Sequence, residues 1–168
     1  MVEKPNQMLS YEEILKKIIP FDRIENLFTD SFREKQTLVF TNGCFDVLHR
    51  GHIYYLSRAR ELGDLLVVGL NSDESVTRLK GPGRPVNNQQ ARAEVLGGLA
   101  FVDHIVIFPE ETPLNLINAI RPHVLIKGGD YKVEEIVGYQ QVHSWGGRVE
   151  TIPLLEGYSS TSIIDRTT

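Results

Sequence analysis

Five short apolar runs recur along the chain, and one segment with helical spacing of apolar residues lies in each interval between them. The runs are rich in β-branched residues and do not alternate strictly with polar positions, which is typical of strands covered on both faces. They span residues 37–41, 65–70, 105–108, 124–127 and 149–153. The helical patterns span residues 51–62, 88–99, 113–120 and 133–145. Strands that alternate with helices predict an α/β fold, with a Rossmann-like five-stranded parallel sheet that carries helices on both faces.

The first 35 residues predict a short helical extension that precedes this sheet. Ser10 and Glu13 have the spacing of a capping box, which predicts a helix that runs to Ile19 and ends before Pro20. A second short amphipathic piece spans residues 21–28 and is followed by a polar gap. We therefore expect an N-terminal helical extension over residues 1–35 and one α/β domain over residues 36–168.

Composition and charge narrow the possible partners. The chain has 18 Lys and Arg against 22 Asp and Glu, and this acidic balance argues against a general nucleic-acid or anionic-membrane binder. The single cysteine, Cys44, excludes an internal disulfide and suits a reducing compartment. The N-terminal sequence lacks a signal-peptide pattern, and the longest apolar run, residues 65–70, is too short to span a bilayer. These features predict a cytoplasmic protein that binds small molecules rather than nucleic acid or membrane.

The candidate chemistry starts in the stretch TNGCFDVLHRGH, residues 41–52, between the first predicted strand and the first predicted helix. In parallel α/β sheets ligands bind beyond the carboxyl ends of the strands. A helix that begins near Gly51 presents free N–H groups there, and phosphate commonly binds at such an end. Gly43 and Gly51 permit close backbone approach, and His49 and His52 can donate hydrogen bonds to phosphate oxygens. Binding of phosphate beside these imidazoles favours their protonated form.

Two other interpretations of the histidine pair remain open on the residues alone. Paired histidines are commonly helix-cap or packing residues. A metal site is a second alternative, although no third His or Cys lies nearby and Asp46 would have to turn toward the pair. We expect Asp46 to orient the turn instead, and we leave Arg92 open between a structural and a phosphate contact.

The tetrad His49-Arg50-Gly51-His52 resembles the H-x-G-H signature of nucleotidyltransferases. Four further segments strengthen the resemblance and narrow it to the ADP-heptose synthase family, the D-glycero-β-D-manno-heptose 1-phosphate adenylyltransferases. They are GLNSDESVTRLKGPGRPVN, VDHIVIF, LIKGGDY and SSTSII, which begin at residues 69, 102, 125 and 159. The resemblance implies transfer of AMP from ATP to heptose 1-phosphate, which releases pyrophosphate and serves lipopolysaccharide inner-core or related glycan synthesis. Because the sugar phosphate is itself a nucleophile, the enzyme needs to align it and stabilise negative charge.

On this basis each candidate site residue has an expected role. The expected catalytic residues are His49, His52 and Lys127. The expected nucleotide-binding residues are Thr41, Asn42, Gly43, Phe45, Gly51, Gly128, Gly129, Asp130, Ser159, Ser160 and Thr161. The expected grip on the sugar phosphate or pyrophosphate comes from Lys80 and Arg84, on a Gly- and Pro-rich loop over residues 78–87. For the lysines and the serines the plain alternatives are a solvated side chain and a simple helix cap.

The remaining expectations concern cofactors and partners. ATP is the substrate, and Mg²⁺ accompanies it, held mainly by the triphosphate with no dedicated protein ligand. Related enzymes imply a homo-oligomer, most simply a dimer. Only about 35 residues precede the catalytic segment, fewer than a kinase domain needs, so a separate heptose kinase is expected to supply the substrate. Two other functions stay open: a cytidylyltransferase acting on glycerol 3-phosphate or a similar phosphorylated molecule, and a non-enzymatic nucleotide-binding module.

Overall fold

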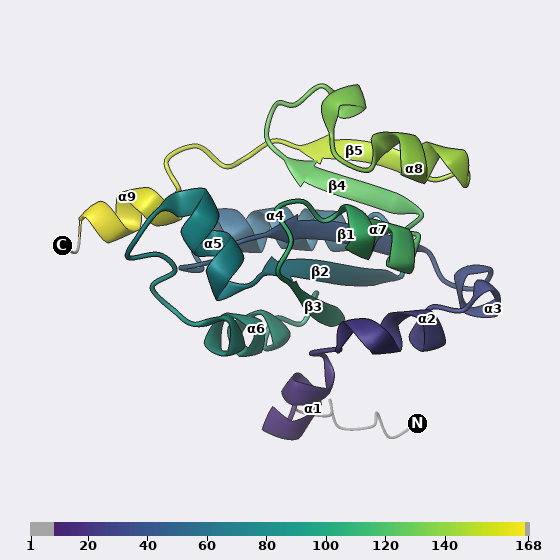
Figure 1. The fold of residues 1–168 in the computed structure, drawn as a ribbon, viewed down its shortest axis with the longest axis horizontal. Coiled ribbons are helices and arrows are strands. Elements are labelled where there is room, and N and C mark those ends of the chain that lie inside the picture. Colours follow the sequence, from purple (N-terminus) through teal and green to yellow (C-terminus); the bar gives the residue numbers. More distant parts are fainter. Residues whose placement is uncertain (1–8, 167–168) are drawn as a thin grey trace, which may run out of the picture.

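Five parallel strands form one sheet at the centre of the protein (Figure 1). A computed structural model describes residues 9–166. The strands are β1 (Leu38–Gly43), β2 (Leu65–Asn71), β3 (His104–Phe108), β4 (Val124–Gly128) and β5 (Arg148–Ile152). Their order across the sheet is β3-β2-β1-β4-β5, so the direction of winding reverses between β1 and β4. The predicted fold class is confirmed, and this reversal marks the edge where such sheets bind ligands.

Helices cover both faces of the sheet. The helices after the first strand are α4 (Arg50–Arg60), α5 (Asp73–Lys80), α6 (Gln89–Gly97), α7 (Leu114–Ile120), α8 (Tyr139–Ser144) and α9 (Ser160–Asp165). One apolar cluster joins the sheet to α4 and α6, and a second cluster joins it to α7 and α8. Figure 1 shows α4 behind the sheet and α7 in front of it. No helix within residues 9–166 combines the length and the apolar character needed to cross a membrane.

The N-terminal extension packs firmly on the second cluster. It contains α1 (Tyr11–Lys16), the 3-10 helix η1 (Phe21–Arg23), α2 (Ile24–Leu27) and α3 (Asp30–Arg33). The predicted capping box of Ser10 and Glu13 is confirmed at the start of α1. Ile24 and Phe28 are fully buried, and burial of an apolar side chain of this size stabilises a fold by about 1.5–3 kcal/mol.

Three predictions differ from the observed element boundaries, two for helices and one for a loop. The first helix ends at Lys16 rather than Ile19, because the backbones of Lys17 and Ile19 pair with Ile105 of the edge strand β3, each over 2.8 Å. The helix predicted over residues 133–145 is split by Gly138, whose φ of 94° lies in the left-handed region, into the 3-10 helix η2 (Val133–Glu135) and α8.

The loop predicted over residues 78–87 is the third error. Helix α5 occupies its first part, so Lys80 lies on a helix. Ser72 caps this helix by accepting a hydrogen bond from the Ser75 N–H over 3.2 Å, and Gly81 follows it with a φ of 93°. A serine before an acidic first turn and a glycine after the last turn are ordinary helix boundary signals.

Candidate active site

A cleft of about 700 Å³ opens at the carboxyl edge of the sheet, where β1 and β4 end and the winding reverses. Twelve of the sixteen predicted site residues line it: Asn42, Gly43, Phe45, His49, Gly51, His52, Lys80, Arg84, Lys127, Ser159, Ser160 and Thr161. The other four, Thr41, Gly128, Gly129 and Asp130, are not among its lining residues. The fold thus brings residues that are spread between Asn42 and Thr161 in the sequence together in one cleft.

The two histidines stack face to face at the start of α4. Their ring centroids lie 3.8 Å apart with an interplanar angle of 25°. His49 is the N-cap of α4, and its Nδ1 accepts a hydrogen bond from the Gly51 N–H over 3.1 Å. Since Nδ1 is an acceptor, the neutral ring carries its proton on Nε2, which remains a donor for a ligand. A Cβ atom at position 51 would lie 3.0 Å from the His49 ring, so a larger residue there would have to displace the capping side chain.

Burial keeps the histidine pair neutral in the free protein. Burial and, to a smaller extent, the neighbouring His49 lower the pKa of His52 from 6.5 to about 4. Burial also lowers the pKa of His49. The Nδ1 atom of His52 is buried without a hydrogen-bond partner among the described residues. A buried polar atom without a partner is costly, so this site favours a ligand that supplies a partner or a proton.

Phe45 packs against the His52 ring. It is only 6% exposed, adopts a left-handed φ of 44°, and meets His52 edge to face at 5.2 Å between centroids. A side chain at position 43 would lie 2.9 Å from the Phe45 ring, which explains the glycine there. Phe45 therefore positions His52 in addition to lining the cleft.

The segment before α9 closes the cleft over the histidines. Ser159 caps α9 by accepting from the Ser162 N–H over 3.0 Å, as the predicted helix cap requires. The Ser160 hydroxyl donates to the Val47 carbonyl over 3.0 Å, which ties α9 to the turn after β1. Arg50 of α4 donates to the Tyr158 hydroxyl over 3.0 Å. These contacts bring the hydroxyl-rich C-terminal segment beside the histidine pair.

Basic side chains surround the thiol of Cys44 at the end of β1. Burial raises the pKa of this thiol, while Lys80, Arg92 and Arg84 act on it in the opposite direction through their charges. Lys127, at the end of β4, is close enough to interact electrostatically with Cys44, and burial lowers its own pKa. Lys127 forms no ion pair with Asp130 or with any other described residue. We call Lys80, Arg84 and Lys127, together with Cys44, the basic centre of the cleft, because all four residues line it.

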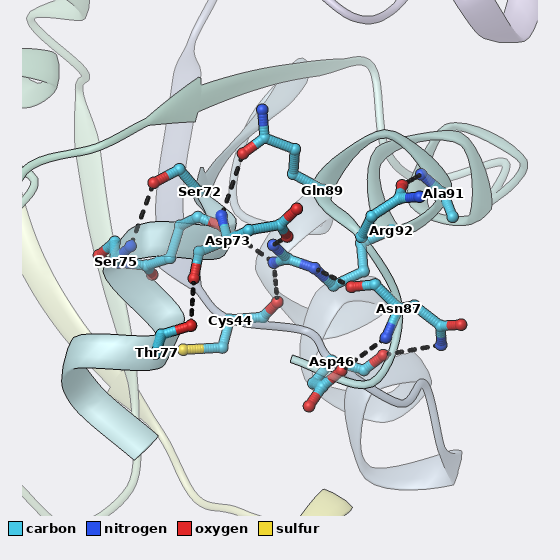
Figure 2. A network of polar contacts seen from close by, with 12 residues as sticks. Cys44, Asp46, Ser72, Asp73, Ser75, Thr77, Asn87, Gln89, Ala91 and Arg92 are labelled. Atoms are coloured by element: carbon cyan, nitrogen blue, oxygen red, sulfur yellow. Dashed lines mark hydrogen bonds and ion pairs between the residues drawn. The ribbon is translucent and has the colours of Figure 1, made fainter. Parts of the chain in front are cut away.

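Two buried ionic groups fix the backbone around the basic centre (Figure 2). The guanidinium of Arg92 donates to the carbonyls of Cys44, Asn71 and Asn87 over 2.7–2.9 Å and to the Asp73 carboxylate over 2.7 Å. Its side chain is 1% exposed, so Arg92 is a structural residue that joins the ends of β1 and β2 to α5 and α6.

Asp46 forms the second of these groups. Its side chain is 1% exposed and accepts from the Arg84 Nε over 2.6 Å and from the Val86 N–H over 2.7 Å. The expected role of Asp46 in orienting the turn is confirmed. The Nε atom of Arg84 is occupied by its ion pair with Asp46. The predicted contact of Arg84 with a substrate phosphate therefore depends on the two terminal nitrogens of its guanidinium.

The four predicted residues outside the cleft have structural surroundings. The Thr41 hydroxyl is fully buried and lies 2.6 Å from the Tyr55 hydroxyl, which donates to the Ile126 carbonyl over 3.3 Å. The Thr41 side chain therefore supports the wall of the cleft from within the sheet. Gly128 is the last residue of β4, and Gly129 and Asp130 follow it, with the Gly129 N–H donating to the Ile152 carbonyl over 3.0 Å.

Several residues that line the cleft carry no sequence motif. They come from α4, from the loop after β3, from η2 and from the segment after β5. They include Tyr55, Glu111, Glu135, Leu154 and Tyr158. Among residues 9–166 no group of three or more His, Cys, Asp or Glu side chains is arranged to hold a metal ion.

Comparison with known proteins places this geometry in a family. The chain is 58% identical over 134 residues to the bifunctional protein HldE of Syntrophotalea carbinolica, and 55% identical over 157 residues to the bifunctional protein HldE of Campylobacter concisus. These alignments cover 80% and 94% of this chain but 27% and 31% of the relatives. The chain thus spans less than a third of the length of these curated relatives.

Solved structures support the fold. The lipopolysaccharide core biosynthesis protein of Thermoplasma volcanium GSS1 is 28% identical with a TM-score of 0.59, over 74% of this chain and 99% of that one. A pantoate-β-alanine ligase of Francisella tularensis shares the fold alone, at 16% identity and a TM-score of 0.58 over 88% of this chain and 75% of that one. Residues 40–166 match the cytidylyltransferase-like family from β1 to α9. The resemblance found in the sequence is confirmed, and the chain belongs to the cytidylyltransferase-like family.

Proposed function

We propose that this protein transfers AMP from ATP to D-glycero-β-D-manno-heptose 1-phosphate, with ADP-heptose and pyrophosphate as products. The observation that carries the proposal is the stacked, neutral histidine pair at the start of α4, open to the cleft beside the basic centre. The sugar-phosphate acceptor rests on the resemblance to the ADP-heptose synthase family and on the identity to the HldE proteins.

In the proposed reaction an oxygen of the sugar phosphate attacks the α-phosphorus of ATP. A new P–O bond forms, the bond from the α-phosphorus to the bridging oxygen breaks, and pyrophosphate leaves with the electron pair. No protein nucleophile takes part. Burial raises the pKa of the Cys44 thiol, which disfavours the thiolate and agrees with a direct transfer.

The residues of the cleft supply positioning and charge. His49 and His52 donate hydrogen bonds to the phosphates, and the bound anion raises their pKa values so that the pair gains protons as the complex forms. Lys127 stabilises the negative charge that spreads over the reacting phosphates. Ser159, Ser160 and Thr161, with the α9 N–H groups, contact the outer phosphates. Lys80 and the free part of Arg84 hold the acceptor phosphate.

The proposal includes Mg²⁺, bound mainly by the triphosphate. A homodimer, a location in the cytoplasm, and a kinase reaction that supplies the heptose 1-phosphate belong to the same proposal. The match to the cytidylyltransferase-like family keeps a cytidylyltransferase acting on glycerol 3-phosphate as the second candidate.

A panel of donors and acceptors tests the proposal. The purified protein is incubated with Mg²⁺, with each of ATP, CTP, GTP and UTP, and with either heptose 1-phosphate or glycerol 3-phosphate, and pyrophosphate release is measured. We expect release with ATP and heptose 1-phosphate. Release with CTP and glycerol 3-phosphate would replace the proposed function by the second candidate. Absence of release from every pair would favour a nucleotide-binding module.

A further inference from the structure

The cleft extends across the carboxyl edge of the sheet and reaches both of its faces. His49, His52 and Tyr55 lie on α4, whose apolar side packs in the first cluster. The opposite part of the wall comes from residues 111–113 and 135–137, next to α7 and η2. Val133 and Ile136 pack on the second cluster, so this wall belongs to the other face of the sheet. We call it the second wall.

The basic centre lies at the strand ends that join these two parts. Cys44 follows β1, the middle strand, and Lys127 is the last residue but one of the neighbouring strand β4. If the nucleotide occupies the part beside the histidines and α9, the phosphate of the acceptor meets the α-phosphate at the basic centre. The remainder of the acceptor then extends along the second wall.

Two carboxylates line the cleft on the second wall. Glu111 lies in the loop between β3 and α7, and its side chain makes no hydrogen bond or ion pair with another described residue. Glu135 ends η2 and contacts only Lys132, its neighbour on the same turn, over 3.7 Å between exposed side chains. An exposed pair of this kind contributes about 0–1 kcal/mol, so Glu135 is free to take another partner.

Carboxylates in a cleft that binds phosphates require a reason, because they repel the anionic substrates. An ionised carboxylate can only accept hydrogen bonds, and the donors that a sugar offers in number are hydroxyl groups. A metal ion is the other partner that carboxylates take, but Glu111 and Glu135 do not belong to any cluster of three or more candidate metal ligands among residues 9–166.

We propose that Glu111 and Glu135 bind hydroxyl groups of the acceptor and thereby select a polyhydroxylated sugar phosphate over a short phosphorylated alcohol. This inference deepens the proposed function and rests on it for the placement of the nucleotide. Hydroxyl groups satisfy both carboxylates, while an acceptor with few hydroxyls leaves one of them without a partner and close to a phosphate. The two carboxylates are therefore specificity-determining residues of the acceptor.

The test compares Glu111→Ala, Glu135→Ala and the double variant with the wild type. Matched controls are Glu110→Ala, in the same loop, and Glu134→Ala, in the same 3-10 helix, because neither residue lines the cleft. Two quantities are measured: the KM values for heptose 1-phosphate and ATP at saturating Mg²⁺, and the Kd of heptose 1-phosphate by calorimetry with a non-hydrolysable ATP analogue present.

We expect the double variant to raise the KM and the Kd for heptose 1-phosphate about 10- to 100-fold, the range for lost hydrogen bonds to a charged group. The KM for ATP stays unchanged, glycerol 3-phosphate is discriminated against less strongly, and Glu135→Gln, which keeps an acceptor oxygen, loses less than Glu135→Ala. Unchanged sugar affinity in the double variant, or a matching rise in the KM for ATP or in the Mg²⁺ requirement, overturns the inference while the proposed function stands.

The failure of the proposed function is recognised separately. If the wild type binds heptose 1-phosphate without releasing pyrophosphate, and the double variant binds it more weakly, the hydroxyl-binding role stands and the proposed reaction does not. If the wild type neither binds the sugar phosphate nor turns it over, both are refuted.

Discussion

The neutral histidine pair makes the stability of the fold depend on pH, and His52→Asn isolates this dependence. The folded-state pKa of His52 is about 4, whereas an exposed histidine in the unfolded chain has a value of 6.5. Because the folded pKa is lowered, the unfolded state binds more protons between these values, so stability is complete above pH 6.5 and is lost as the pH falls toward 4. Each pKa unit corresponds to about 1.36 kcal/mol, which gives about 3 kcal/mol over the whole window. Partial solvent access of the ring reduces the expected value to about 2 kcal/mol.

Urea unfolding of the wild type and of His52→Asn, at intervals from pH 7.5 to pH 4.5, measures this effect. Groups common to both proteins cancel in the difference between the two free energies of unfolding, apart from His49, which loses its stacked neighbour in the variant. We expect the variant to gain about 1 kcal/mol relative to the wild type between pH 7 and pH 5, because this range covers only part of the window between the two pKa values. His143→Asn, on the exposed side of α8, serves as the control and should follow the wild type. A difference between His52→Asn and the wild type that does not change with pH would refute the buried, neutral state of the pair.

Three further predictions concern single side chains. Arg92→Ala leaves three carbonyls and a carboxylate without their shared donor, so it should lower the free energy of unfolding by about 3–5 kcal/mol. The control Arg58→Ala, at an exposed ion pair, should change it by less than about 1 kcal/mol, and equal urea midpoints for the two variants would contradict this prediction. Tyr55→Phe should cost about 1–2 kcal/mol in the same assay, because it removes the buried hydroxyl between two strands, and exposed Tyr54→Phe should cost almost nothing; a similar effect of both changes would argue against the buried contact. Lys127→Met should reduce kcat by about 100-fold or more with little change in stability, and a normal kcat in steady-state kinetics would remove Lys127 from the catalytic role.

Local sequence signals predicted the five strands and the start of α4 well. The apolar run over residues 124–127 became β4 with one residue added, and the other four strands lie within two residues of their predicted ends. The stretch over residues 41–52 predicted the strand, the turn and the helix start, because the glycines and the capping histidine act within a few residues of one another. Short-range signals of this kind can be read directly from the sequence.

Two of the wrongly predicted boundaries are marked by local residues in the sequence. Ser72, the acidic residues after it and Gly81 mark the bounds of α5, and Gly138 marks the break in the helix predicted after β4. The pairing of Lys17 and Ile19 with Ile105 has no local signal in the sequence. These backbone hydrogen bonds depend on a strand that lies more than 80 residues away in the sequence.

The parts of the site that could not be predicted depend on long-range convergence. Arg92 lies in an amphipathic helix where an arginine is usually solvated, and its burial follows from carbonyls at residues 44, 71 and 87 that meet only in the folded chain. Glu111 and Glu135 belong to no motif, and they line the same cleft only because β3 and β4 both end at the same edge. The sequence resemblance, in turn, included Thr41 as a nucleotide contact although its hydroxyl faces Tyr55.

The most direct measurement follows the α-phosphate itself. The wild type, His52→Ala and the control His143→Ala are incubated with ATP labelled at the α-phosphorus, Mg²⁺ and heptose 1-phosphate, and the label is traced to product and to protein. We expect labelled ADP-heptose from the wild type and the control, a loss of at least about 100-fold in the rate with His52→Ala, and no label on the protein when the acceptor is omitted. Label bound covalently to the protein, or an undiminished rate with His52→Ala, would contradict a direct transfer in the histidine-lined cleft.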